Sequence, residues 1–133
     1  MTSLNLAIVL RKVGKIAEAS AILKQGLSIA NQPRNELQIC RYSLELANVA
    51  VIKQDAEEAK GHCEAATRIA ETNNYRREQV LAKEIEGDIA YLKKDYEAAI
   101  EAYTSGLTQA REFARGSDLE YELLGRVARA YLA

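Results

Sequence analysis

The sequence predicts an all-α protein made of stacked pairs of antiparallel helices, which we expect to form a right-handed superhelix. Similar segments return every forty residues, because Gly14–Ala19, Gln54–Ala59 and Lys94–Ala99 align with one another. A fixed period of this size is typical of a helical solenoid. One proline and seven glycines in 133 residues favour long uninterrupted helices. The alanines that recur in register are Ala19, Ala59 and Ala99, and Ala30, Ala70 and Ala110.

The forty-residue period divides the chain into about seven helices, two in each of three repeats and one at the end. The repeats cover about residues 1–34, 35–74 and 75–114, and the terminal helix covers residues 118–132. Within each repeat we call the first helix A and the second helix B. The expected helices run from about Ser3 to Lys12, Lys15 to Asn31, Asn35 to Lys53, Asp55 to Asn73, Arg76 to Leu92, Asp95 to Phe113 and Leu119 to Leu132.

Local signals predict where these helices start and stop. Pro33 ends the first B helix, because proline cannot donate a backbone hydrogen bond and restricts the residue before it. Asp55 is an expected N-cap, and Glu58 three residues later completes a capping-box-like pattern. Asp95 caps the third B helix in the same way. Gly116 is a C-terminal glycine before a new N-cap, so a further helix begins there.

The A helix expected from Asn35 to Lys53 is apolar around most of its circumference. A helix with this pattern is covered by neighbours on nearly all sides. We therefore expect it in the centre of the stack.

Composition and charge exclude several classes of protein. The chain is 48% hydrophobic and 28% charged, which is ordinary for a soluble domain. Eighteen basic and nineteen acidic residues leave a formal charge of -1, so the general attraction for nucleic acid is missing. No secretory signal or membrane-spanning segment is visible. These features predict a cytoplasmic protein that contacts neither nucleic acid nor a membrane.

The sequence offers no catalytic or metal-binding pattern. His62 is the single histidine, and the two cysteines, Cys40 and Cys63, form no CxxC pair, so a zinc site would lack ligands. The two cysteines are offset along antiparallel helices, so we expect buried free thiols and no disulfide. No glycine-rich phosphate loop is present. We expect a protein that is not an enzyme and has no cofactor.

The residues of the third repeat resemble the tetratricopeptide repeat family, and the resemblance covers essentially the whole chain. In that family small residues allow paired helices to approach closely, and the A helices line a concave groove. The period of forty instead of thirty-four, the absence of Trp and the single Pro33 are departures from the family pattern. The matching residues are Gly87-x-x-x-Tyr91-x-x-Asp95-Tyr96-Glu97-x-Ala99-x-x-x-Tyr103-x-x-Gly106-Leu107.

The longer unit is similar to repeats of bacterial signalling proteins, including large ATP-dependent transcriptional activators and peptide-sensing regulators. Armadillo or HEAT repeats are the structural alternative, although neither a proline-kinked first helix nor a third helix per repeat is visible. The truncated first helix favours a piece of a longer protein over a complete domain.

A helical wheel of the A helices gives the side chains that would face the groove of such a superhelix. Glu84 and Asp88 occupy the region where the family's carboxylate clamp needs basic residues, so we expect no such clamp. The alternative is that the leucines at these positions are core between repeats and the polar residues are solvated surface. The predicted partner-binding residues are Arg41, Asn48, Glu84, Asp88, Tyr91, Tyr121 and Tyr131.

These features together predict a scaffold that binds a peptide or a partner helix along the A-helix face, within a larger cytoplasmic bacterial regulator. The alternative function is self-association through apolar faces at the ends of the repeats.

Overall fold

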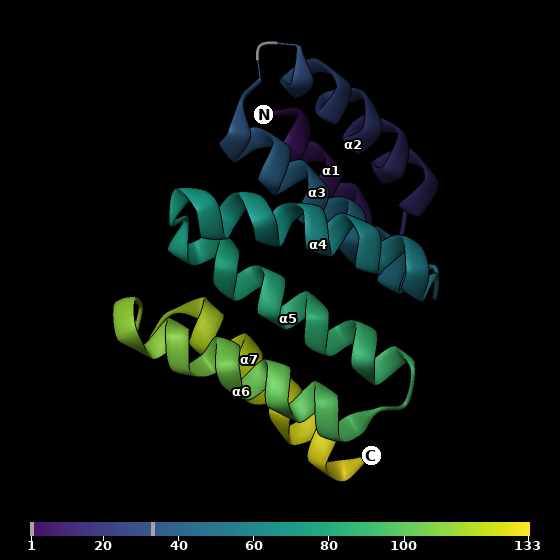
Figure 1. Ribbon diagram of the computed structural model, residues 1–133. Coiled ribbons are helices and arrows are strands. Elements are labelled where there is room, and N and C mark those ends of the chain that lie inside the picture. Colours follow the sequence, from purple (N-terminus) through teal and green to yellow (C-terminus); the bar gives the residue numbers. More distant parts are fainter. Residues whose placement is uncertain (1, 33) are drawn as a thin grey trace.

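A computed structural model describes residues 2–32 and 34–133, and within these residues it contains seven α-helices and no strand (Figure 1). The prediction of an all-α chain with three helix pairs and a terminal helix is confirmed. The helices are α1 (Ser3–Lys12), α2 (Ile16–Asn31), α3 (Glu36–Ile52), α4 (Ala56–Asn73), α5 (Arg76–Leu92), α6 (Tyr96–Phe113) and α7 (Asp118–Leu132).

The helix ends follow the local signals closely. Asp55 caps α4 and Asp95 caps α6, each accepting a hydrogen bond from a backbone N–H three residues later. The capping box at Asp55 is only half formed, because the Glu58 carboxylate lies 3.4 Å from Lys53 Nζ, while the Asp55 N–H donates to the Ala50 carbonyl. Helix α2 ends at Asn31, as predicted. Pro33, the predicted cause, lies outside the described residues.

The turns between the helices of each pair repeat the same backbone conformation. Gly14, Gln54 and Lys94 are spaced forty residues apart, and each has a positive φ, of 89°, 62° and 64° respectively. This left-handed conformation is easy for glycine and unfavourable for other residues. The forty-residue period therefore extends from the side chains to the backbone of the turns.

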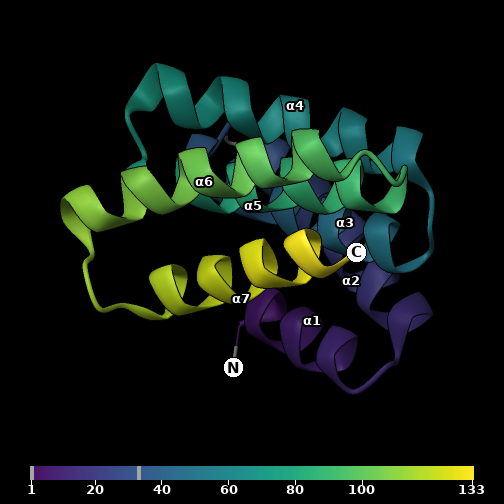
Figure 2. The same cartoon turned by 90° about the horizontal axis from the view of Figure 1, so that it is seen from below.

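The odd-numbered helices form one layer and the even-numbered helices form the other (Figures 1 and 2). Each odd-numbered helix packs against the next odd-numbered helix as well as against its even-numbered neighbours. In the part of the chain that the structure describes, no two even-numbered helices pack against each other. The odd-numbered helices are therefore a continuous layer.

The core consists of one apolar cluster at each junction between repeats. The first cluster joins α1, α2 and α3, the second joins α3, α4 and α5, and the third joins α5, α6 and α7. Helix α3 contributes to two clusters, and most of its residues are buried. This confirms that the apolar A helix lies inside the stack. Ala19, Ala59 and Ala99 are completely buried, as their role in close helix packing requires.

Cys40 and Cys63 are both buried and both free, as expected. Each thiol donates a hydrogen bond to a backbone carbonyl of a neighbouring helix, Cys40 to Ala66 and Cys63 to Ala82, both at 3.4 Å. None of the helices within residues 2–32 and 34–133 has both the length and the apolar character needed to cross a membrane.

Candidate functional site

A hollow with a volume of about 240 Å³ lies where all four odd-numbered helices meet. Its walls combine aliphatic, aromatic, amide and guanidinium groups, which is the mixture found in sites that recognise polypeptides. The lining residues are Arg11 from α1, Asn48, Val51 and Ile52 from α3, Asp88, Tyr91 and Leu92 from α5, and Arg126 and Arg129 from α7.

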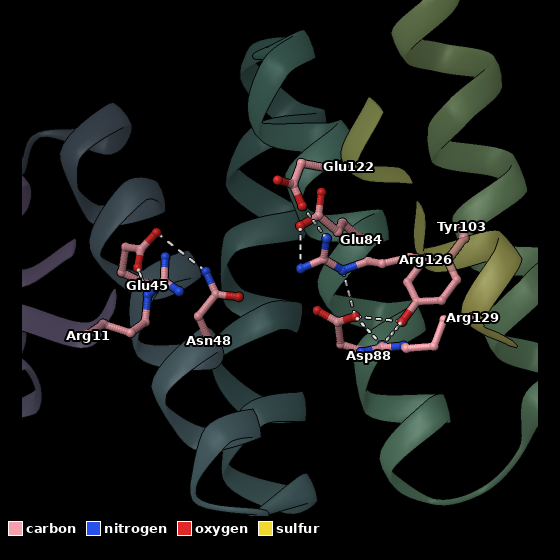
Figure 3. A network of polar contacts seen from close by, with 9 residues as sticks. All are labelled: Arg11, Glu45, Asn48, Glu84, Asp88, Tyr103, Glu122, Arg126 and Arg129. Atoms are coloured by element: carbon pink, nitrogen blue, oxygen red, sulfur yellow. Dashed lines mark hydrogen bonds and ion pairs between the residues drawn. The ribbon is translucent and has the colours of Figure 1, made fainter. Parts of the chain in front are cut away.

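On one side of the hollow, a polar cluster joins α1 to α3 (Figure 3). The Arg11 Nε donates to Glu45 Oε2 at 2.9 Å, and the Asn48 amide donates to Glu45 Oε1 at 3.4 Å. Both members of the Arg11–Glu45 pair are largely buried, so solvent screens the pair less than it would on an open surface. Glu45 therefore fixes the positions of two side chains that line the hollow.

On the other side, Asp88 is the centre of a network that joins α5, α6 and α7 (Figure 3). Its Oδ1 accepts hydrogen bonds from the Tyr103 hydroxyl at 2.5 Å and from Arg126 Nε at 3.0 Å. Arg129 donates to the Tyr103 hydroxyl at 3.3 Å. Burial is the largest cause that raises the pKa of Tyr103 above its usual value, and the hydrogen bond to Asp88 raises it further. This hydroxyl therefore stays a donor at neutral pH.

Glu84 lies beside this network and is incompletely paired. Its Oε1 is 3.1 Å from Arg126 Nη2, but its Oε2 is buried and has no hydrogen-bond partner among the described residues. Burial raises the pKa of Glu84 to about 7, although the positive charge of Arg126 acts in the opposite direction. Asp88 raises the pKa further, because two carboxylates are close together. Glu84 is therefore a carboxyl group that can change its protonation near neutral pH.

Arg126 holds three carboxylates together. Besides Glu84 and Asp88, its guanidinium contacts Glu122 on its own helix, at 2.8 Å. Burial alone would lower the pKa of Arg126, but Asp88 and Glu84 together raise it above its usual value. The guanidinium is thus permanently charged and anchors α7 to α5.

Tyr91 forms the aromatic wall of the hollow. The Arg129 guanidinium carbon lies 4.0 Å from the centre of its ring, which is a cation–π contact. The Tyr96 ring packs against it edge to face, with the ring centres 5.2 Å apart. The ring of Tyr91 is therefore held in place from both sides.

The structure brings together four of the seven predicted partner-binding residues. Asn48, Asp88 and Tyr91 line the hollow, and Glu84 belongs to the adjoining network. Arg41 lies elsewhere, in a separate hollow of about 450 Å³ beside α1 and α2, where its Nε is 3.5 Å from the buried Glu78 carboxylate. Tyr121 and Tyr131 are strongly exposed on α7 and do not line the hollow.

The three arginines of the hollow are not among the residues predicted from the sequence. Arg11 could have been found, because it precedes Val51 by one period of forty residues and therefore occupies a groove position of the first repeat. Arg126 and Arg129 could not have been found in this way. The residues eighty positions earlier, two periods back, are Leu46 and Val49, which are core residues of α3.

A larger hollow of about 650 Å³ lies beside α4 and α5, with Asp95 before α6 at its edge. Cys63 is one of its lining residues, and burial raises the pKa of this thiol to about 11. A thiol that stays protonated at neutral pH is a poor nucleophile and metal ligand. In the described ranges, no group of three or more His, Cys, Asp and Glu side chains is arranged to hold a metal ion.

Comparison with protein-family models, with curated proteins and with solved structures finds no match to this chain.

Proposed function

We propose that the chain is a non-enzymatic scaffold that binds an extended peptide or a helix of a partner protein across its odd-numbered helices. The observation that supports this most directly is the hollow to which α1, α3, α5 and α7 all contribute side chains. A ligand lying across the four helices would touch every repeat. The resemblance to tetratricopeptide repeats supports the same face, since the A helices of that family line its groove.

The chemistry of the hollow favours a ligand of mixed polarity. Ile52 and Leu92 offer aliphatic surface, and the preformed Tyr91–Arg129 stack offers a flat wall for an apolar or aromatic side chain. The Asn48 side chain carries both an amide donor and a carbonyl acceptor, so it can pair with the main chain of an extended peptide. Most charges in the hollow are already paired with each other, so net charge is not the main source of affinity.

The biological setting follows from the resemblance. We infer a segment of a larger cytoplasmic bacterial regulator or assembly factor, in which this domain recruits another protein. The near-neutral chain contributes no direct contact with nucleic acid.

Selection of displayed peptides against the intact chain tests the proposal. Peptides that bind the wild type should lose most of their affinity for Ile52→Arg, because the exposed isoleucine is replaced inside the hollow by a bulky charge. The matched control is Thr104→Arg, which adds the same side chain to an exposed position of α6. If the selected peptides bind Ile52→Arg and Thr104→Arg with the same affinity as the wild type, the odd-numbered face is not the docking surface.

A further inference from the structure

The hollow of the odd-numbered helices presents a positive face to a ligand, although the chain as a whole has a formal charge of -1. Its charged lining residues are Arg11, Arg126, Arg129 and Asp88. The side chains of the three arginines are 20%, 26% and 51% exposed, whereas that of Asp88 is 11% exposed. A ligand that enters the hollow therefore meets more arginine surface than carboxylate surface.

Most of the carboxylates that pair with these arginines lie outside the lining of the hollow. Glu45, Glu84 and Glu122 each contact one of the arginines, but none of them is a lining residue. Asp88 is the one carboxylate of the lining among the residues that the structure describes. The charge that faces a ligand is therefore positive, even though the surrounding network contains carboxylates as well as arginines.

The arginines keep unused hydrogen-bonding capacity. An arginine carries five N–H donors and no acceptor. Among the described residues, Arg11 donates one hydrogen bond, to Glu45, and Arg129 donates one, to Tyr103. Asp88 already accepts two hydrogen bonds through one of its oxygens. The free capacity of the lining is thus mainly that of a donor, and an acceptor group on the ligand would complete it.

Arg129 is the best placed of these donors. Its guanidinium carbon lies 4.0 Å from the centre of the Tyr91 ring, and its Nη2 donates to the Tyr103 hydroxyl, so the group is held by two contacts while half of the side chain stays exposed. A planar guanidinium can pair with a carboxylate through two parallel hydrogen bonds. Because the side chain is already held in one orientation, ordering it on binding costs little.

We propose that the partner segment bound in the hollow is acidic, and that one of its aspartate or glutamate side chains pairs with Arg129. The inference rests on the proposed function, because it names the chemistry of the ligand at the same site. Charge here sets the choice and orientation of the partner, and the aliphatic and aromatic walls supply most of the affinity.

The positions of the arginines favour acidic side chains within the segment over a carboxylate at its C-terminus. Arg11 and Arg129 lie on opposite sides of the hollow (Figure 3), so a second carboxylate of the segment can reach Arg11. A chain terminus supplies only one carboxylate. The site also differs from the carboxylate clamp of the tetratricopeptide repeat family, because Glu84 and Asp88 occupy the clamp region in this chain.

The experiment starts from peptides that a random displayed library yields against the intact wild-type chain. Their sequences should contain more Asp and Glu than Lys and Arg. One binding peptide is then synthesised, together with copies in which one acidic residue at a time is replaced by Asn or Gln. For at least one position the affinity should fall about tenfold or more, and the affinity of the parent peptide should fall as salt is added. These measurements need no protein variant.

The variant Arg129→Gln identifies the arginine. Its side chain is half exposed, so the fold depends little on it, and circular dichroism checks that the helices remain. The parent peptide should bind Arg129→Gln about tenfold more weakly than the wild type, whereas the critical Asn or Gln copy should bind the two proteins equally. Arg115→Gln is the matched control, because it removes the same charge from an exposed position outside the hollow, and it should bind like the wild type.

The outcomes separate the acidic partner from the docking surface itself. If no peptide binds, or if Ile52→Arg binds peptides like the wild type, the proposed function fails and the acidic partner fails with it. Peptides can also bind the wild type and lose affinity for Ile52→Arg, yet tolerate every Asn or Gln replacement, keep their affinity for Arg129→Gln, or lose affinity equally for Arg115→Gln. Each of these results, or a loss seen only when the C-terminal carboxylate is amidated, overturns the pairing with Arg129 and leaves the docking surface in place.

Discussion

The ring of Tyr103 on α6 lies directly over Gly87 on α5. A Cβ atom added to residue 87 would be 2.3 Å from Tyr103 Cε1, well inside the contact distance of two carbon atoms. Tyr103 is completely buried, and its hydroxyl is tied to Asp88, so the ring cannot move aside. The absence of a side chain at residue 87 thus permits the close packing of the third helix pair and positions the donor that binds Asp88 in the candidate site.

Gly87→Ala should destabilise the protein, although alanine is the better helix former. We expect the free energy of unfolding to fall by about 1–2 kcal/mol, because overpacking outweighs the gain of helix propensity. Urea denaturation measures the change. Gly61→Ala is the matched control, since no described atom beyond its chain neighbours and the backbone of its own helix lies within 4 Å of the added Cβ, and it should raise stability by about 0.5–1 kcal/mol. Equal effects of the two substitutions would contradict the packing described at Gly87.

Lys94→Gly should stabilise the protein. Lys94 adopts a φ of 64° in the turn between α5 and α6, at the repeat position that Gly14 occupies in the first pair. Glycine removes the steric cost of the left-handed conformation but also gives the unfolded chain more freedom, so the net gain should be about 0.5–1 kcal/mol. Thermal denaturation tests this, and Lys93→Gly is the control, because residue 93 has an ordinary φ of -80°. Lys93→Gly should lower the stability. If Lys94→Gly lowers it by the same amount, the prediction is wrong.

The fold could be predicted from sequence because its determinants recur in register. The completely buried Ala19, Ala59 and Ala99 and the left-handed turn positions return every forty residues, and the capping aspartate recurs in the second and third repeats, so the repeats support one another's interpretation. The departures are local: Ser117 stands at the N-cap of α7, but its side chain makes no capping bond to any described residue.

The candidate site could be predicted only where it follows the same period. Asn48 and Asp88 are forty residues apart, and Val51 and Tyr91 are too, and all four line one hollow. The arginines of α7 break the pattern, since Arg126 occupies the repeat position that Leu46 fills with a core side chain. The same repeat position carries the exposed Glu86 on the internal helix α5. The period therefore does not decide whether this position is core or surface, and no rule derived from the repeats locates the arginines.

Ala99→Leu should destabilise the chain by overpacking. Ala99 is completely buried in the cluster that joins α5, α6 and α7, so an isobutyl group has no space without moving a helix. We expect a loss of about 1–3 kcal/mol of unfolding free energy, visible as a lower melting temperature. Ala17→Leu, on the exposed side of α2, should leave the melting temperature almost unchanged. An unchanged melting temperature for Ala99→Leu would mean that the third helix pair does not pack as described.

Glu84→Gln should become progressively more stable, relative to the wild type, as the pH rises. The pKa of Glu84 is about 7 in the folded protein and 4.5 for an ordinary glutamate, so the folded state binds more protons than the unfolded state between these values. The wild type therefore loses stability as the pH rises from below 4.5 to above 7, by up to about 3 kcal/mol, and glutamine cannot take part in this loss.

The measurement compares urea denaturation of both proteins on either side of that pH interval. Glu122→Gln is the control, because it removes an exposed carboxylate from the same Arg126 guanidinium and leaves the buried carboxyl group of Glu84 in place. Its difference from the wild type should vary less with pH than that of Glu84→Gln. The physical reason is burial: a carboxyl group with an unpaired buried oxygen is costly to ionise even beside an arginine. If the stability difference between Glu84→Gln and the wild type is constant over the interval, Glu84 titrates in the folded protein as it does in the unfolded chain, and its burial next to Asp88 has no electrostatic consequence.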